Sequence, residues 1–247
     1  MKNKSFGLIV LMAFLLLVFQ QFAAGTGRFV ANLFAYDRID PYNIFAWISV
    51  HHIVQMIIAL AAVGILAKVK GFNFGFGLGN VKVGLEHTLY FSIGVLIYVI
   101  VNNAIAYFSG GFYAPDFPLN VTNVAGTLGF QLFLSGPSEE ILFRALPITL
   151  LACSFKTSKS IKIYKLEVSL ETIIAAVLFA IAHIGWQINP FSITQINMHQ
   201  LVLSIVFGAF YGIAYQKSKS IIYPMIMHSI SNVVIVGAWY ILTVILR

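Results

Sequence analysis

Charged residues are scarce in this sequence. Only 9% of its 247 residues are Asp, Glu, Lys or Arg, whereas soluble globular domains carry about 25%. Hydrophobic residues make up 60% of the chain, a balance that excludes an ordinary soluble domain and indicates an integral membrane protein. The net charge of +7 fits lysines in loops between membrane helices better than a nucleic-acid-binding surface, so no nucleic-acid partner is expected.

Other common features are also missing. Cys153 is the single cysteine, so an intrachain disulfide is impossible. The sequence has no internal repeat and no His-Glu-x-x-His pattern, which disfavours a transporter built from repeated halves and the common helical zinc-protease motif.

Long apolar runs are present instead. At about 1.5 Å per residue, roughly 20 apolar residues cross the hydrocarbon core of a bilayer. The sequence therefore predicts an all-α, polytopic membrane protein with about seven membrane helices, six to eight being possible. The predicted helices span residues 6–22, 44–67, 84–108, 124–151, 170–186, 198–216 and 221–246. Residues 1–123 form N-terminal helices without a recognised signature, and residues 124–247 form a core that carries the motifs described below.

The lysines gather in alternate loops of this predicted topology. If the N-terminus is cytoplasmic, the inner segments hold Lys2, Lys4, Lys68, Lys70, Lys82, Lys156, Lys159, Lys162, Lys165, Lys217 and Lys219. The outer segments then hold Arg28, Arg38 and Arg247. This asymmetry predicts a cytoplasmic N-terminus and an external C-terminus.

The most unusual polar residues lie inside the run 124–151. Glu139, Glu140 and Arg144 would each cost about 2.5–3.5 kcal/mol at the centre of a membrane helix, and groups of that cost usually face the protein interior and carry function. Glu140 and Arg144 are four residues apart and can pair on one helix face. Glu139 would then be left to act as a general base. Pro137 is expected to interrupt the hydrogen bonding of this helix and to kink it.

Two further polar pairs occur in apolar helices. Phe179 and His183, like His228 and Asn232, are four residues apart, so each pair shares a helix face. The predicted topology places these residues and Glu139 between the midplane and the cytoplasmic side, so they can form one site. The adjacent pair His51-His52 is predicted to be interfacial and without a catalytic role.

These motifs resemble a known family. Glu-Glu-x-x-x-Arg at 139–144, Phe-x-x-x-His at 179–183 and His-x-x-x-Asn at 228–232 are similar to the three motifs of the CPBP intramembrane proteases. That family includes the CAAX prenyl endopeptidases of the Rce1 type and bacterial Abi-domain proteins, some of them linked to bacteriocin processing or immunity. The resemblance extends over about Val124 to Trp239, roughly the second half of the chain.

The resemblance implies hydrolysis of a peptide bond inside the membrane. By analogy, Glu139 would activate water, His183 and His228 would orient the water or stabilise the oxyanion, and Asn232 would donate to the oxyanion. Glu140, Arg144 and Phe179 would support them. No cofactor is favoured, although zinc is possible, with Glu139, His183 and His228 as its ligands. Asn suits an oxyanion hole better than a zinc site, which favours the glutamate-dependent mechanism.

The resemblance also implies a setting and partners. We expect a multi-pass protein of a cell membrane, most simply a bacterial plasma membrane, with the lipid bilayer and a lipidated or membrane-associated peptide or small membrane protein as partners. A sensor kinase or a peptide-export protein is a further possible partner. The alternative function is a non-enzymatic bacteriocin-immunity or kinase-binding scaffold. A proton- or ion-coupled transporter is the third possibility.

Overall fold

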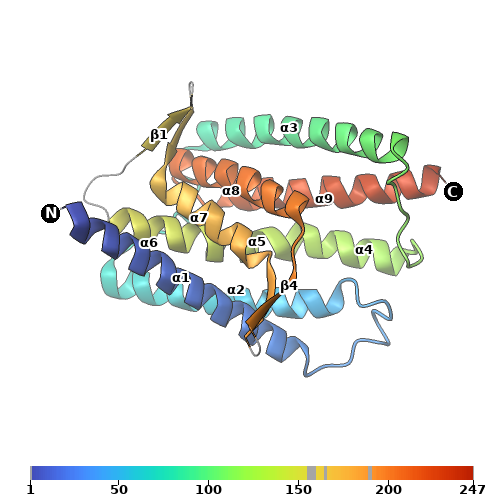
Figure 1. Cartoon of the computed structure of the whole chain (residues 1–247), viewed down its shortest axis with the longest axis horizontal. Helices are drawn as coiled ribbons and strands as arrows, with labels where there is room; N and C mark the ends of the chain where they lie inside the picture. The colour runs from blue at the N-terminus through green and yellow to red at the C-terminus, as the bar shows by residue number, and fades with distance from the viewer. Residues whose placement is uncertain (1, 155–159, 164–165, 189–190, 247) are drawn as a thin grey trace.

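The computed structural model describes residues 2–154, 160–163, 166–188 and 191–246. Its long helices are α1 (Lys2–Ala31), α2 (Ala46–Lys70), α3 (Val81–Phe108), α8 (Met198–Ser218) and α9 (Ile222–Ile245), and α7 (Leu170–Ala182) is shorter. After α3 and before α7 in the chain, residues 121–154 form one continuous helical segment, called the rod below. It consists of α4 (Val121–Phe130), η1 (Gln131–Ser135), α5 (Gly136–Glu140), η2 (Ile141–Ala145) and α6 (Leu146–Ser154). The helices run mostly along one axis as a bundle (Figure 1).

The all-α membrane architecture predicted from the sequence is confirmed. Within the described residues, five helices are long and apolar enough to cross a membrane, namely α1, α2, α3, α8 and α9. The other two predicted spans correspond to the rod Val121–Ser154, which is not one regular α-helix, and to α7, which has 13 residues. Two predicted helix ends differ clearly from the observed ones. The helix predicted to end at residue 22 continues to Ala31 as α1, and the helix predicted to end at residue 186 ends at Ala182 as α7.

Two short hairpins replace segments that were predicted as loop or helix. Strands β1 (Ser160–Ile163) and β2 (Leu166–Ser169) pair antiparallel before α7. Strands β3 (Gly185–Ile188) and β4 (Phe191–Gln195) pair antiparallel after it. The first hairpin leads directly into α7, whose first turn is capped by the Ser169 side chain accepting from the Thr172 backbone N–H at 3.1 Å. The two hairpins therefore flank, along the chain, the helix that carries Phe179.

The segments bearing most of the described lysines meet at one end of the bundle. The end of α2, the start of α3, the β1–β2 hairpin and the α8–α9 turn lie there (Figure 1). The connector 71–80 is tied to the α8–α9 turn, because Asn80 N donates to Ser218 O at 2.6 Å and Ile221 N donates to Gly75 O at 2.8 Å. Helix α1 starts and α9 ends at opposite ends of the bundle. Lys156, Lys159, Lys165 and Arg247 lie outside the described residues, as do the side chains of Lys2 and Lys4.

The rod is disturbed on both sides of α5. The π-helical segments η1 and η2 flank the five residues Gly136–Glu140. Pro137 has no backbone N–H to donate, so a regular hydrogen-bond ladder cannot pass through this point. One-turn π segments are often found at functional sites, because they redirect the side chains that follow them. The interruption predicted at Pro137 thus coincides with the stretch that carries both glutamates.

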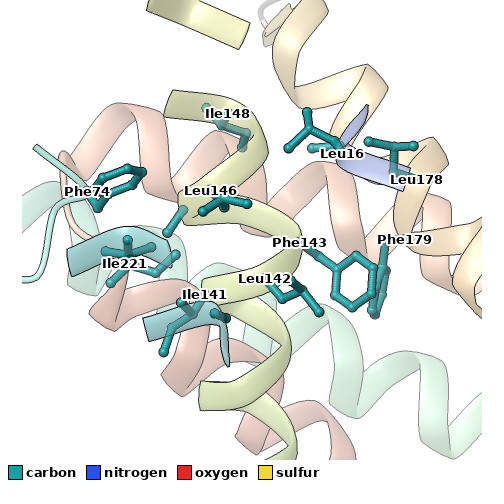
Figure 2. Close-up of a cluster of buried hydrophobic side chains, with 14 of the residues drawn as sticks. Leu16, Phe74, Ile141, Leu142, Phe143, Leu146, Ile148, Leu178, Phe179 and Ile221 are labelled. Carbon is teal, nitrogen blue, oxygen red and sulfur yellow. The ribbon is translucent and has the colours of Figure 1, made fainter. Parts of the chain in front are cut away.

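The buried core surrounds the second half of this rod. Residues 141–148 pack against α1, α7 and the 71–80 connector, and Leu142, Ala145 and Leu151 are fully buried. Figure 2 shows Phe143 of the rod beside Phe179 of α7, with ring centroids 5.2 Å apart. This packing holds the rod and α7 in a fixed relation, which positions the polar residues described next.

Candidate active site

The centre of the site is a buried ion pair. Nη1 of Arg144 lies 3.0 Å from Oε1 of Glu140, and both side chains have no exposed surface. The predicted pairing of these two residues on one helix face is therefore found. Charges buried in this way are stable only when they are paired, and removing one partner leaves a costly uncompensated charge.

Aromatic rings enclose the guanidinium of Arg144. Its Cζ lies 4.0 Å from the ring centroid of Phe179 and 5.2 Å from that of Tyr211. A cation over a ring face is attracted by the ring quadrupole, most strongly where water is excluded. Gly208 of α8 leaves room for this group, because a Cβ at that position would lie 2.7 Å from Nη2 of Arg144. Phe179 thus supports the site through Arg144 as well as through His183.

His228 lies between the two glutamates. Its Nδ1 is 2.7 Å from Oε1 of Glu140, and its Nε2 is 3.6 Å from Oε2 of Glu139. Tyr211 stacks on the imidazole with an interplanar angle of 16° and centroids 5.1 Å apart. The hydroxyl of Tyr211 is in turn fixed by Ser231 Oγ at 2.7 Å. The orientation of His228 is therefore set on three sides.

His183 and Asn232 complete the predicted set. His183 Nδ1 is 2.8 Å from the carbonyl oxygen of Phe179, four residues earlier. A carbonyl only accepts, so Nδ1 carries the hydrogen and Nε2 of the neutral ring is an acceptor. Asn232 Nδ2 donates to Ser135 Oγ at 3.0 Å, which uses one of its two amide hydrogens.

These residues face a shared cavity. Glu139, His183, His228 and Asn232 all line a cavity of about 270 Å³, and the side chain of Glu139 is 16% exposed, whereas Glu140 has no exposed surface. A larger cavity of about 480 Å³ continues from His183, His228 and Asn232 along α3, α8 and α9. The structure thus brings the four residues predicted as catalytic together and separates the two glutamates into a cavity-facing one and a buried one.

One residue of the site was not predicted. His52 of α2 was expected to be interfacial, yet it is 5% exposed and lines the smaller cavity. Its Nε2 is 3.7 Å from Oε1 of Glu139, and its Nδ1 is 2.6 Å from Ser138 Oγ. His51 is also buried and stacks on Trp47. The expectation failed because α2 begins at Ala46 and enters the bundle at once, with its first turn capped by Asp40.

The possible zinc ligands Glu139, His183 and His228 have the following arrangement. Within the described ranges, no group of three or more His, Cys, Asp or Glu side chains is placed so that it could hold a metal ion. Nδ1 of His183 is held by the Phe179 carbonyl and Nδ1 of His228 by Glu140, contacts that orient each ring and leave Nε2 for other partners. As placed here, Glu139, His183 and His228 do not form such a group.

One family model matches part of the chain. Residues 122–234 match the family model described as type II CAAX prenyl endopeptidase Rce1-like. This range resembles an Rce1-like domain, and the match supports a membrane-embedded protease of the CAAX type in general. No curated protein and no solved structure matches the chain. The matched range contains Glu139, His183, His228 and Asn232, whereas His52 lies outside it.

Proposed function

We propose that this protein is an intramembrane endopeptidase that uses Glu139 to activate the water that cleaves a peptide bond. Its substrate would be a membrane-associated or lipidated peptide or a small membrane protein. The observation that carries the proposal is that Glu139 faces a cavity also lined by His183, His228 and Asn232, while the neighbouring Glu140 is neutralised by Arg144. A carboxylate that faces a cavity beside a buried, paired one is suited to act as a general base.

The first step would be proton abstraction. Glu139 takes a proton from a water in the cavity, and the resulting hydroxide attacks the carbonyl carbon of the substrate. Nε2 of neutral His183 accepts a hydrogen bond from that water and orients it, because its Nδ1–H is donated to the Phe179 carbonyl. The C–O bond forms as the carbonyl π bond opens, which places a negative charge on the carbonyl oxygen.

The second step needs donors for that oxyanion. Asn232 has one amide hydrogen left after its bond to Ser135, and His228, in its doubly protonated form, can donate through Nε2 while Nδ1–H remains on Glu140. Preorganised donors of this kind are worth about 10²–10³-fold in kcat each. The C–N bond then breaks, and Glu139 returns its proton to the leaving amine, so a peptide and water become an acid and an amine.

The larger cavity would hold the rest of the substrate. Its walls are mainly apolar and aromatic and include Tyr98, Phe207 and Trp239. Tyr98 is fixed by a contact of 2.8 Å between its hydroxyl and His199 Nε2. An apolar cavity that continues into a few convergent polar groups is the usual form of a site for a hydrophobic ligand. We place the apolar or lipidated part of the substrate there.

The test is cleavage of fluorogenic lipidated and leader peptides by purified protein, with wild type beside Glu139→Gln and His183→Asn. Each protein is measured with and without a chelator. We expect cleavage by wild type with or without chelator, and none by Glu139→Gln. Cleavage that needs added zinc would overturn the metal-free mechanism. A Glu139→Gln variant that retains the wild-type cellular phenotype would favour the scaffold alternative.

A further inference from the structure

We infer that His52, on an N-terminal helix outside the Rce1-like domain, is a positioning residue for Glu139. Its Nε2 holds the carboxylate in the orientation required to accept a proton from water. This inference rests on the proposed function, since it assigns a role within the same site. It also means that the Rce1-like domain lacks one part of its site unless α2 is present.

The first argument is the symmetry of contacts around Glu139. Oε1 faces Nε2 of His52 at 3.7 Å, and Oε2 faces Nε2 of His228 at 3.6 Å. Both contacts are longer than hydrogen bonds, as is common for catalytic groups before substrate binds. With one imidazole on each oxygen, rotation of the carboxylate is restricted from both sides. His228 alone would leave Oε1 without a partner on the α2 side.

The second argument concerns the hydrogen of His52. A carboxylate oxygen only accepts, so a favourable contact requires the hydrogen on Nε2. Ser138 Oγ lies 2.6 Å from Nδ1 of His52 and 3.2 Å from the Ser135 carbonyl. The Ser138 hydroxyl has a single hydrogen, so donation to Nδ1 replaces donation to the Ser135 carbonyl. We place this hydrogen on the shorter contact, and the neutral ring then carries its own hydrogen on Nε2, facing Glu139. Ser138 thereby selects the ring form that can hold the general base.

The third argument is that one imidazole ring, that of His52, contacts both Ser138 and Glu139. Ser138 and Glu139 follow each other in α5, so their side chains point about 100° apart and cannot contact each other directly. The two nitrogens of His52 bridge them from α2. Phe130 meets the edge of the same ring, with centroids 5.0 Å apart, and His52 is buried and lines the smaller cavity.

Two amide substitutions separate positioning from packing. The amide of Gln reaches the place of Nε2, whereas the shorter Asn reaches the place of Nδ1. We expect His52→Gln to keep kcat within a few fold of wild type. We expect His52→Asn, which keeps only the contact with Ser138, to lower kcat by about tenfold to a hundredfold with little change in KM. His51→Gln is the matched control on the same helix and should retain the wild-type kcat. An Asn variant as active as the Gln variant would overturn the inference.

Ser138→Ala provides a second test if either variant is poorly folded. It should lower kcat in the wild-type background, because the ring form of His52 is no longer selected. In the His52→Asn background it should cause no further fall, because the contact with Glu139 is already lost. Independent, multiplicative losses in the double variant would overturn the inference.

Failure of the inference is distinguishable from failure of the proposed function. If wild type cleaves and Glu139→Gln does not, the function stands and the His52 variants decide the inference alone. If wild type cleaves no peptide, the proposed function is overturned, and the contact is measured by a double-mutant cycle of melting temperatures for His52→Asn, which lacks the contact with Glu139, and Glu139→Gln. Additive shifts would then overturn the contact, and non-additive shifts would support it.

Discussion

His228 and Glu140 are joined by a contact of 2.7 Å between Nδ1 and Oε1, and the same carboxylate is neutralised by Arg144. One buried glutamate therefore does two things: it holds an imidazole that faces the cavity, and it compensates a guanidinium with no access to solvent. The other glutamate, Glu139, faces the cavity and is the proposed general base. Because the two adjacent carboxylates differ in their contacts, substitutions of Glu140 and Glu139 should have different effects on stability and activity.

Glu140→Gln should destabilise the protein and lower its activity. The amide oxygen can still accept from His228, but Arg144 loses its counter-charge in a buried position, where breaking such a pair costs about 3–5 kcal/mol. We expect a large fall in melting temperature in detergent, together with reduced kcat. Glu139→Gln is the matched control, because Glu139 faces the cavity, and it should abolish cleavage with a much smaller thermal shift. Equal thermal shifts in the two variants would contradict this assignment.

Gly136→Ala should weaken the contact between α5 and α9. A Cβ at Gly136 would lie 2.8 Å from the Met225 carbonyl oxygen and 3.0 Å from the Ser229 backbone nitrogen. Backbone atoms cannot move aside as a flexible side chain can, so overpacking of about 1–3 kcal/mol is expected. The unfolding free energy measured in mixed micelles tests this.

Gly129→Ala is the control for that substitution. Gly129 lies in the same rod, and its added Cβ would meet nothing within 4 Å. Alanine is favoured over glycine in a helix by about 1 kcal/mol, so this variant should be neutral or slightly more stable. A comparable loss of stability in both variants would contradict the prediction, because helix propensity favours alanine at both positions and only Gly136 lies against α9.

Ser135→Ala should misplace Asn232. The Ser135 hydroxyl accepts from Asn232 Nδ2 at 3.0 Å and is itself buried. Without it the amide can rotate, and the hydrogen that would donate to the oxyanion in the proposed mechanism is misplaced for part of the time. Loss of a group that orients a catalytic residue costs about tenfold or more, and we expect it in kcat rather than in KM. Steady-state kinetics would contradict the prediction if KM alone changed.

The sequence predicts most of the helices and much of this site for one physical reason. Long apolar runs define the helices, and a charged or polar residue within such a run is costly enough to stand out. Glu139, Glu140, Arg144, His183, His228 and Asn232 were all found in this way. The same cost applies to His52, so treating it as a membrane-helix residue would have revealed it.

The remaining features depend on contacts between distant segments. His52 and Ser138 are 86 positions apart, and serine and tyrosine hydroxyls such as those of Ser135 and Tyr211 give no signal in an apolar helix. The two hairpins were missed because each strand has only four or five residues, too few for an alternating pattern to be distinguished from a loop. The π-helical form of the rod could be anticipated only as an interruption at Pro137.

Leu203→Trp should impair substrate binding more than catalysis. Leu203 of α8 lines the larger cavity, where the proposal places the apolar part of the substrate, away from Glu139. A tryptophan there would fill part of the 480 Å³ cavity and compete with the substrate, so KM should rise while kcat at saturation stays near that of wild type.

Val202→Trp is the control, because the side chain of Val202 is 55% exposed and does not line this cavity. Its kinetics should be unchanged. If Leu203→Trp instead lowered kcat at unchanged KM, the substrate would have to enter from another direction, and the smaller cavity beside Ile48 and Gln131 would become the entrance to examine.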